Sequence, residues 1–177
     1  MRSVLITVLL GMISISLKAQ KDGRGWPQQV DSVPLAPYQK FPNNPPIDIL
    51  LLDSVTRFKT TDLDKQKPVV LMIFSPDCDH CQHETEAIIK NIDSFKDVQI
   101  VMVTWLAFAE MKSFYKRYEL DRFPNIVMGH DTRFMLPPYF GFHNLPFMAF
   151  YDKKKKFVSV FEGSMPVEKL IERVKTL

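Results

Sequence analysis

Stretches that are apolar at nearly every position alternate along most of the chain with stretches whose apolar residues recur at helical spacing. Val69–Phe74 is apolar at every position, and Val98–Trp105 is apolar at most positions. Runs without a helical period predict strands buried on both faces, as in a parallel or mixed sheet covered by helices. Apolar residues at helical spacing then predict one buried helix face, formed by Met111, Phe114, Tyr115 and Tyr118.

The C-terminal part continues the alternation. Short strands are expected at Ile126–Met128, Phe147–Tyr151 and Phe157–Phe161. The four lysines at 153–156 suit a solvated turn between the last two strands. We expect Ser164 to cap a final helix whose apolar face consists of Val167, Leu170, Ile171 and Val174.

The only two cysteines, Cys78 and Cys81, follow the first buried strand. We expect Asp77 to cap a helix that buries Cys81, Ile88, Ile89 and Ile92, so that Cys78 lies at the helix N-terminus. Free backbone N–H groups and the helix dipole favour a thiolate there, and the thiolate is the nucleophile in disulfide exchange. Cys81 lies on the same face, close enough to close a small disulfide ring. The pair predicts sulfur redox chemistry.

The surroundings of the Cys-x-x-Cys pair resemble a known protein group. A buried strand, a turn and a helix with this pair are similar to thioredoxin. Leu52-Asp53, Phe58-Lys59 and Thr61-Asp62-Leu63 resemble the entry to the TlpA/ResA-type thioredoxin-like proteins of the bacterial cell envelope, within the redoxin and AhpC/TSA-like superfamily. Leu145-Pro146-Phe147 resembles the cis-proline of that group. The likeness covers roughly residues 47–177.

This resemblance implies a fold and a set of site residues. The fold is α/β and thioredoxin-like, with a central mixed sheet flanked by helices and an N-terminal β-hairpin extension formed by Ile47–Leu52 and Thr56–Lys59. The implied catalytic residues are Cys78, Cys81, Glu84 and Pro146. The cysteines form the redox-active disulfide, Glu84 exchanges protons with Cys81, and Pro146 is cis and lies against the pair.

Each of these roles has a plainer alternative. By position alone, Glu84 is one more exposed helix residue and Pro146 is an ordinary trans proline at the start of a strand. Asp79 and His80 are expected to modulate the pair. His80 resembles the histidine of the oxidising DsbA-type Cys-Pro-His-Cys, but Asp79 stands in place of the proline and its carboxylate opposes a neighbouring thiolate. A solvated residue at the helix start is the alternative for His80.

The expected function is thiol–disulfide exchange with partner proteins through Cys78-Asp79-His80-Cys81, without a cofactor or metal. The partners are protein thiols or disulfides and an unidentified redox partner. The alternatives are copper or other metal binding, with further ligands from His80, His83, His130 and His143, and a non-catalytic interaction module. A peroxidase ranks lower, because Leu71 stands where that family has a proline before Ser75 and Cys78. Some aromatic residues could form an apolar rim for a polypeptide: Tyr139, Phe140, Phe142 and Phe147.

The first 46 residues predict export. Met1-Arg2, an apolar run from Ser3 to Leu17 and then Lys18-Ala19 have the layout of a signal peptide at 1–19. The apolar run is shorter than the roughly 20 residues that a membrane-spanning helix needs, so we expect no stable membrane span after processing and a location in the periplasm or cell envelope. Residues 20–46 are proline-rich and are expected to form an extended leader before the domain at 47–177.

Charge and composition add one exclusion. The chain is 46% hydrophobic and 24% charged, as in ordinary soluble proteins. Loss of Arg2 and Lys18 with the signal peptide leaves a nearly neutral mature chain, which gives no reason to expect nucleic acid as a partner. Two cysteines in one motif leave no structural disulfide framework for an exported domain, so the pair is expected to be functional.

Overall fold

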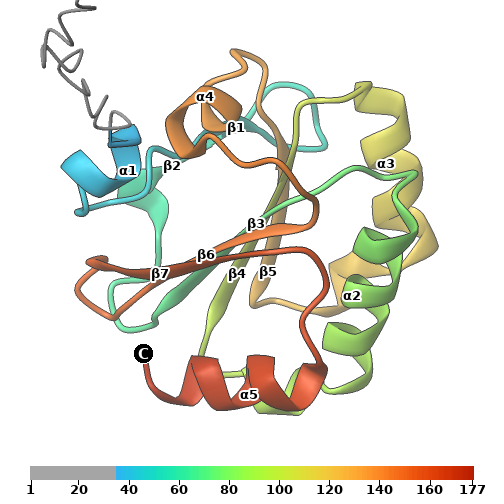
Figure 1. The fold of residues 1–177 in the computed structure, drawn as a ribbon. Coiled ribbons are helices and arrows are strands. Elements are labelled where there is room, and N and C mark those ends of the chain that lie inside the picture. Colours follow the sequence, from blue (N-terminus) through green and yellow to red (C-terminus); the bar gives the residue numbers. More distant parts are fainter. Residues whose placement is uncertain (1–34) are drawn as a thin grey trace, which may run out of the picture. The chain divides into compact units, whose positions relative to one another are not determined.

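In the computed structural model, residues 35–177 are described. The predicted signal peptide at 1–19 and the leader up to residue 34 lie outside the described residues. In the described part, seven strands form one sheet in the order β2-β1-β5-β4-β3-β6-β7 (Figure 1). They are β1 (Asp48–Leu50), β2 (Arg57–Lys59), β3 (Val69–Ile73), β4 (Gln99–Thr104), β5 (Ile126–His130), β6 (Phe147–Tyr151) and β7 (Phe157–Glu162).

Strand β3 is an inner strand of this sheet and has one parallel and one antiparallel neighbour. It pairs in parallel with β4 and antiparallel with β6, where Ile73 is opposite Phe147. All five of its residues are buried, as the uninterrupted apolar run predicted. At one edge β1 and β2 form the expected antiparallel hairpin, with Asp48 opposite Lys59.

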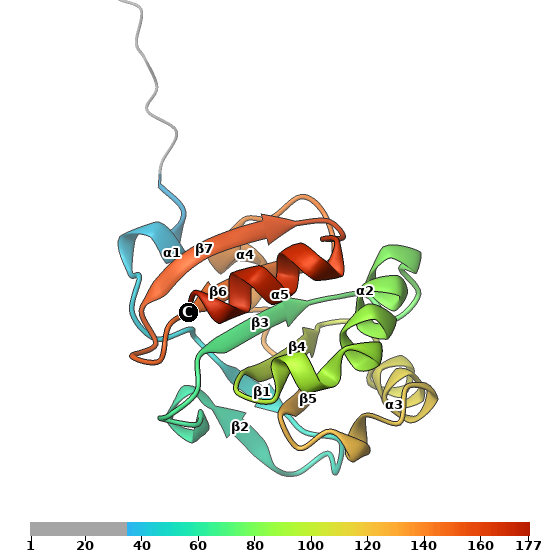
Figure 2. The same ribbon diagram turned by 90° about the horizontal axis from the view of Figure 1, so that it is seen from below.

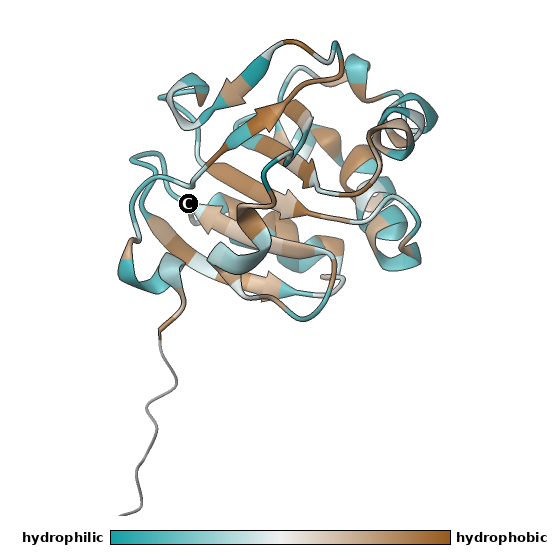
Figure 3. Cartoon of the chain, turned by 90° about the horizontal axis from the view of Figure 1, so that it is seen from above, coloured by the Kyte–Doolittle hydropathy of each residue, from teal (hydrophilic) through white to brown (hydrophobic). Residues whose placement is uncertain are grey.

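Helices cover both faces of the sheet (Figure 2). They are α1 (Pro37–Lys40), α2 (Asp79–Lys90), α3 (Phe108–Arg117), α4 (Leu136–Phe140) and α5 (Val167–Lys175), with 3-10 turns η1 (Thr60–Asp62), η2 (Ile92–Phe95) and η3 (Leu120–Arg122). Val70 and Met72 point to the core shared with α2, α3 and α5. Leu71 and Ile73 point to a second core with α4 and α1. Apolar residues accordingly concentrate in the inner strands (Figure 3).

This architecture confirms the predicted thioredoxin-like fold and adds two short helices. Helix α4 lies in the segment between β5 and β6 that was expected to be a loop, and it buries Leu136 and Phe140. Helix α1 lies in the leader that was expected to be extended, with Pro37 at a first-turn position where the missing N–H is harmless. The leader also pairs with the sheet edge through an isolated bridge between Asn43 and Lys156.

Two predicted helix caps are wrong. Helix α2 begins after Cys78, which is its N-cap, while Asp77 accepts a hydrogen bond from the Ser75 hydroxyl instead. Helix α5 begins after Pro166, and the Ser164 hydroxyl donates to the carbonyl of His80 at 3.2 Å. In both cases the side chain hydrogen-bonds another partner and does not cap the helix. The Ser164 contact joins residues far apart in the sequence, so local pattern could not reveal it.

The four-lysine turn is also not fully solvated. Lys155 is 8% exposed and has φ +63°. Its Nζ donates to the carbonyls of Asp64 and Lys67, each at 2.6 Å. The ammonium group thus ties the β6–β7 turn to the segment before β3.

We expect Lys155→Met to lower the free energy of unfolding by roughly 2 kcal/mol, because it leaves the carbonyls of Asp64 and Lys67, and a longer contact to the carbonyl of Lys153, without their charged donor. Lys154→Met is the matched control, since Lys154 is exposed in the same turn, and its effect should stay below about 0.5 kcal/mol. Urea denaturation of both variants measures the difference. Equal losses would contradict a role for the buried ammonium group.

Candidate active site

The cysteine pair lies where β3 ends and α2 begins. The chain leaves the sheet after Phe74, whose N–H donates to the carbonyl of Val103 at 2.9 Å. It then turns, and the N–H of Cys78 donates to the carbonyl of Ser75 at 3.2 Å. As N-cap, Cys78 supplies the carbonyl for the first helical bond, from Gln82 N–H at 3.0 Å. Cys78 therefore lies at the N-terminus of α2, as predicted, just beyond the C-terminal end of β3.

The two thiols have unequal environments. Both are free, Cys78 is half-buried and Cys81 is fully buried. Burial raises the pKa of Cys81 strongly; a backbone hydrogen bond at Ser75 opposes the shift, and the neighbouring Cys78 and Glu84 add to it. Cys81 therefore keeps its proton at neutral pH. Cys78 is the accessible sulfur of the pair.

Glu84 is buried beside the cysteine pair. Its side chain is 2% exposed, on the same helix face as Cys81, Thr85 and Ile88. Oε2 accepts a hydrogen bond from the backbone N–H of Met165 at 2.8 Å, while Oε1 is buried with no hydrogen-bond partner. Burial raises the pKa of Glu84 to about 7, and the Met165 hydrogen bond opposes that rise. The alternative of an exposed helix residue is thus wrong.

Pro146 stands at the start of β6, next to the end of β3. The Leu145–Pro146 peptide bond is cis, as predicted. Because Ile73 is opposite Phe147, continuing the antiparallel register puts Pro146 beside Phe74, at the end of the strand that leads to the cysteines. That the loop before Pro146 faces the Cys78 sulfur remains a prediction, and this register supports it.

Asp79 and His80 are exposed in the first turn of α2. The backbone carbonyl of His80 accepts a hydrogen bond from the Ser164 hydroxyl. Their modulating role remains a prediction.

The expected aromatic rim is divided. Phe140 and Phe147 are core residues, whereas Tyr139 and Phe142 are half-buried. Phe142 stacks on Phe147 with ring centroids 5.1 Å apart and lies 5.8 Å from the ring of Trp105. One side of the Phe142 ring thus packs on the core, while part of its surface stays accessible in the loop before Pro146.

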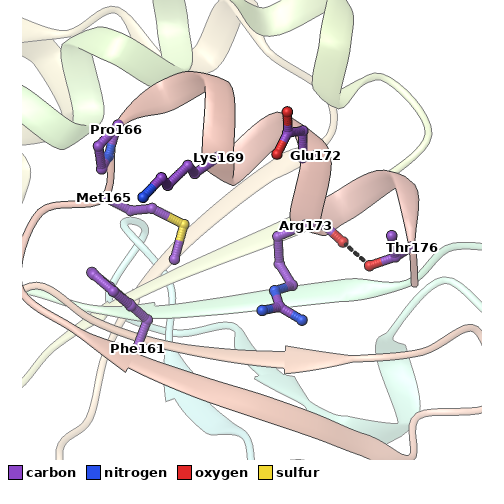
Figure 4. Close-up of a pocket in the computed structure, with 7 residues that line it drawn as sticks. All are labelled: Phe161, Met165, Pro166, Lys169, Glu172, Arg173 and Thr176. Carbon is purple, nitrogen blue, oxygen red and sulfur yellow. Dashed lines mark hydrogen bonds between the residues drawn. The ribbon is translucent and has the colours of Figure 1, made fainter.

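Three residues of the C-terminal part that contact the site had no sequence signal. Glu162, Ser164 and Met165 each hydrogen-bond an element of the site. Each contact spans at least 18 positions of sequence, so neither periodicity nor motif spacing could reveal it. Met165 also borders a pocket of about 430 Å³, whose other lining residues are Phe161, Pro166, Lys169, Glu172, Arg173 and Thr176 (Figure 4).

The arrangement of strand, cysteine pair and cis-proline agrees with a family comparison. The model of the AhpC/TSA family matches residues 43–174. The chain belongs to the AhpC/TSA family. No curated protein gives a significant sequence match. The family match begins close to the hairpin of β1 and β2 and ends within α5, so it covers the whole sheet.

Solved structures similar to this AhpC/TSA-family chain are thioredoxin-like. The MTB dsbF structure, in mixed oxidized and reduced forms, is 26% identical with a TM-score of 0.63, over 74% of this chain and 94% of that chain. A secreted Mycobacterium tuberculosis disulfide oxidoreductase homologous to E. coli DsbE is 21% identical with a TM-score of 0.63, over 75% of this chain and 96% of that chain. The exposed lipoprotein thioredoxin Etrx1 of Streptococcus pneumoniae is 22% identical with a TM-score of 0.60, over 74% of this chain and 98% of that chain.

The family and the fold together agree with the TlpA/ResA-type resemblance and support thiol–disulfide redox function in general. Among residues 35–177, no helix is long and apolar enough to cross a membrane.

Proposed function

We propose that the protein is a thiol–disulfide oxidoreductase that exchanges disulfides with partner proteins through Cys78-Asp79-His80-Cys81. The observation that carries the proposal is the inequality of the two thiols: Cys78 is half-buried, whereas Cys81 is fully buried and its pKa is strongly raised by that burial. An accessible attacking sulfur and a sheltered resolving sulfur are what two-step exchange requires. The signal-like residues 1–19 support a place of action in the periplasm or cell envelope.

In the reducing direction, the Cys78 thiolate attacks one sulfur of the partner disulfide. That S–S bond breaks, a mixed disulfide forms, and the other partner sulfur leaves as a thiolate. Cys81 then gives its proton to the Glu84 carboxylate and attacks the Cys78 sulfur, which releases the second partner thiolate. The partner gains two electrons and leaves as two thiolates, which take up one proton returned by Glu84 and one from water, and the Cys78–Cys81 pair is left oxidised. The same steps in reverse oxidise a partner dithiol.

Glu84 suits the proton step for two reasons. It lies one helical turn from Cys81 on the same face, where side chains three residues apart are neighbours. Its raised pKa of about 7 lets it accept and return a proton near neutral pH.

The main alternative is metal binding, chiefly copper. In the described part of the chain, no three His, Cys, Asp or Glu side chains gather as a group that could hold a metal ion. His80 is exposed, and His130 Nε2 lies 2.6 Å from the carbonyl of Leu106. These placements favour exchange as the function of the pair.

The test equilibrates the purified protein in glutathione buffers of stepped redox ratio and counts free thiols by alkylation and mass. We expect one reversible Cys78–Cys81 disulfide, and reduced protein that then reduces insulin with one pair oxidised per disulfide cleaved. A pair that stays reduced in every buffer, or a pair that cycles while insulin remains intact, would favour an interaction module. Stoichiometric copper retained through purification would favour the metal alternative.

A further inference from the structure

The four residues Glu162–Met165, between the end of β7 and the start of α5, contact both halves of the candidate active site. We name this segment the strap. We propose that the strap is a positioning device that fixes the loop before the cis-proline against the cysteine helix, and that Glu162 is its main side-chain contributor. The proposal rests on the proposed function, because it assigns residues that hold the same site.

The first half of the strap holds the loop before Pro146. The Glu162 carboxylate oxygen Oε2 accepts hydrogen bonds from the backbone N–H groups of His143 and Asn144, both at 3.0 Å, and from the Asn144 side-chain amide at 3.3 Å. The N–H of Gly163 then donates to the carbonyl of Pro146 at 2.8 Å. Three donors from two consecutive loop residues thus depend on one carboxylate.

The second half holds the cysteine helix. The Ser164 hydroxyl donates to the carbonyl of His80, between the cysteines, and the Met165 N–H donates to Glu84. The Met165 side chain is turned towards Phe161, so only its backbone serves Glu84 (Figure 4). Four consecutive residues therefore connect Asn144, Pro146, His80 and Glu84, which come from two separate elements.

A carboxylate is suited to this task. A single negative oxygen can accept several N–H donors at once, and hydrogen bonds to a charged acceptor are stronger than neutral ones. The loop held by Glu162 has exposed residues at His143 and Asn144, so little apolar packing would fix these two positions without it. Phe142, at the start of the loop, is fixed separately by stacking on Phe147.

The strap predicts a difference between large and small reactants. A protein disulfide must dock on the loop beside Pro146, whereas a small alkylating agent needs only access to the Cys78 sulfur. We expect Glu162→Ala to slow the reduction of insulin roughly tenfold, which corresponds to about 1.4 kcal/mol of lost positioning. Alkylation of Cys78 by iodoacetamide should change less than about twofold. Glu162→Gln keeps one acceptor oxygen and should recover most of the insulin rate.

The matched control is Asp53→Ala. Asp53 also accepts hydrogen bonds from two backbone N–H groups, Val55 at 3.0 Å and Thr56 at 2.8 Å, and from the Thr56 hydroxyl, but in the β1–β2 turn. The Asp53→Ala substitution removes a similar set of hydrogen bonds but leaves the loop before Pro146 unchanged. We expect its insulin rate to match that of the wild type.

The outcomes separate this inference from the proposed function. Wild-type protein that reduces insulin, with Glu162→Ala equally fast, would overturn the strap and leave the oxidoreductase intact. A Glu162→Ala variant that loses insulin reduction and alkylation in the same proportion would also overturn it, because general unfolding of the site would explain both. If Glu162→Ala proves unstable, Ser164→Ala supplies the comparison, because it removes the strap's hydrogen bond to the His80 carbonyl, and at an unchanged melting temperature it should slow insulin reduction more than alkylation. Wild-type protein inert toward insulin contradicts the proposed function itself.

Discussion

Replacing Cys81 with serine should turn the protein into a covalent trap for its partners. Cys78 keeps its accessible sulfur in this variant and can still attack a partner disulfide. The resolving thiol is gone, so the mixed disulfide has no internal route to release. Partner proteins should therefore accumulate on Cys78. Cys78→Ser should trap far less, by roughly tenfold or more, because the remaining Cys81 thiol is buried and holds its proton.

The measurement is a non-reducing gel of tagged variants expressed in the cell envelope, followed by mass spectrometry of the bands that a reductant removes. The double variant with serine at both positions is the control for non-covalent association. Equal trapping by the two single variants would contradict the assigned roles, since it would mean that both sulfurs reach the partner equally well. Trapping by neither variant would contradict exchange with proteins.

The sequence was sufficient to predict those elements whose reason is local. The run Val69–Phe74 is apolar throughout because β3 has a core on each face, and this pattern alone predicts an inner strand of a covered sheet. The Cys-x-x-Cys spacing places both sulfurs at one helix start. Even the burial of Glu84 had a local signal, since Cys81, Glu84, Thr85 and Ile88 follow the spacing of one helix face. A glutamate in such a row is easily mistaken for an exposed residue, because buried carboxylates are rare.

The features that sequence did not reveal depend on partners distant in the chain. Ser164 has the chemistry of a helix cap, but its hydroxyl finds the carbonyl of His80, 84 positions away. Lys155 looks like any lysine of a turn, yet its ammonium group reaches carbonyls 88 and 91 positions away. In each case the side chain could satisfy a local role or a tertiary one, and only the packed fold decides between them.

The second large effect is expected at Glu84, and it concerns pH. Burial raises its pKa to about 7 from an ordinary 4.5, so the folded protein holds a proton that the unfolded chain releases between these values. Protonation thus favours the folded state, and stability should fall as the pH rises from about 4.5 to about 7, by roughly 3 kcal/mol in total. Glu84→Gln is neutral at every pH, so it should lose this slope and be at least as stable as the wild type at pH 8.

The rate of exchange should respond in the opposite direction. Above pH 7 the wild-type Glu84 is a carboxylate that can take the proton of Cys81, whereas glutamine cannot, and loss of a general base typically slows a step by at least about tenfold. Glu84→Gln should therefore be a more stable but slower protein at pH 8.

The step to measure is the release of glutathione from a mixed disulfide on Cys78, followed by stopped flow from pH 5 to pH 9. Glu86→Gln is the control, because Glu86 lies on the same helix but is half-exposed and paired with Lys90 at 3.8 Å. A wild-type rate that shows no change in slope near pH 7, or a Glu84→Gln profile that overlays it, would leave Glu84 without a part in proton transfer. A flat wild-type stability curve between pH 4.5 and 7 would instead contradict the burial of its charge.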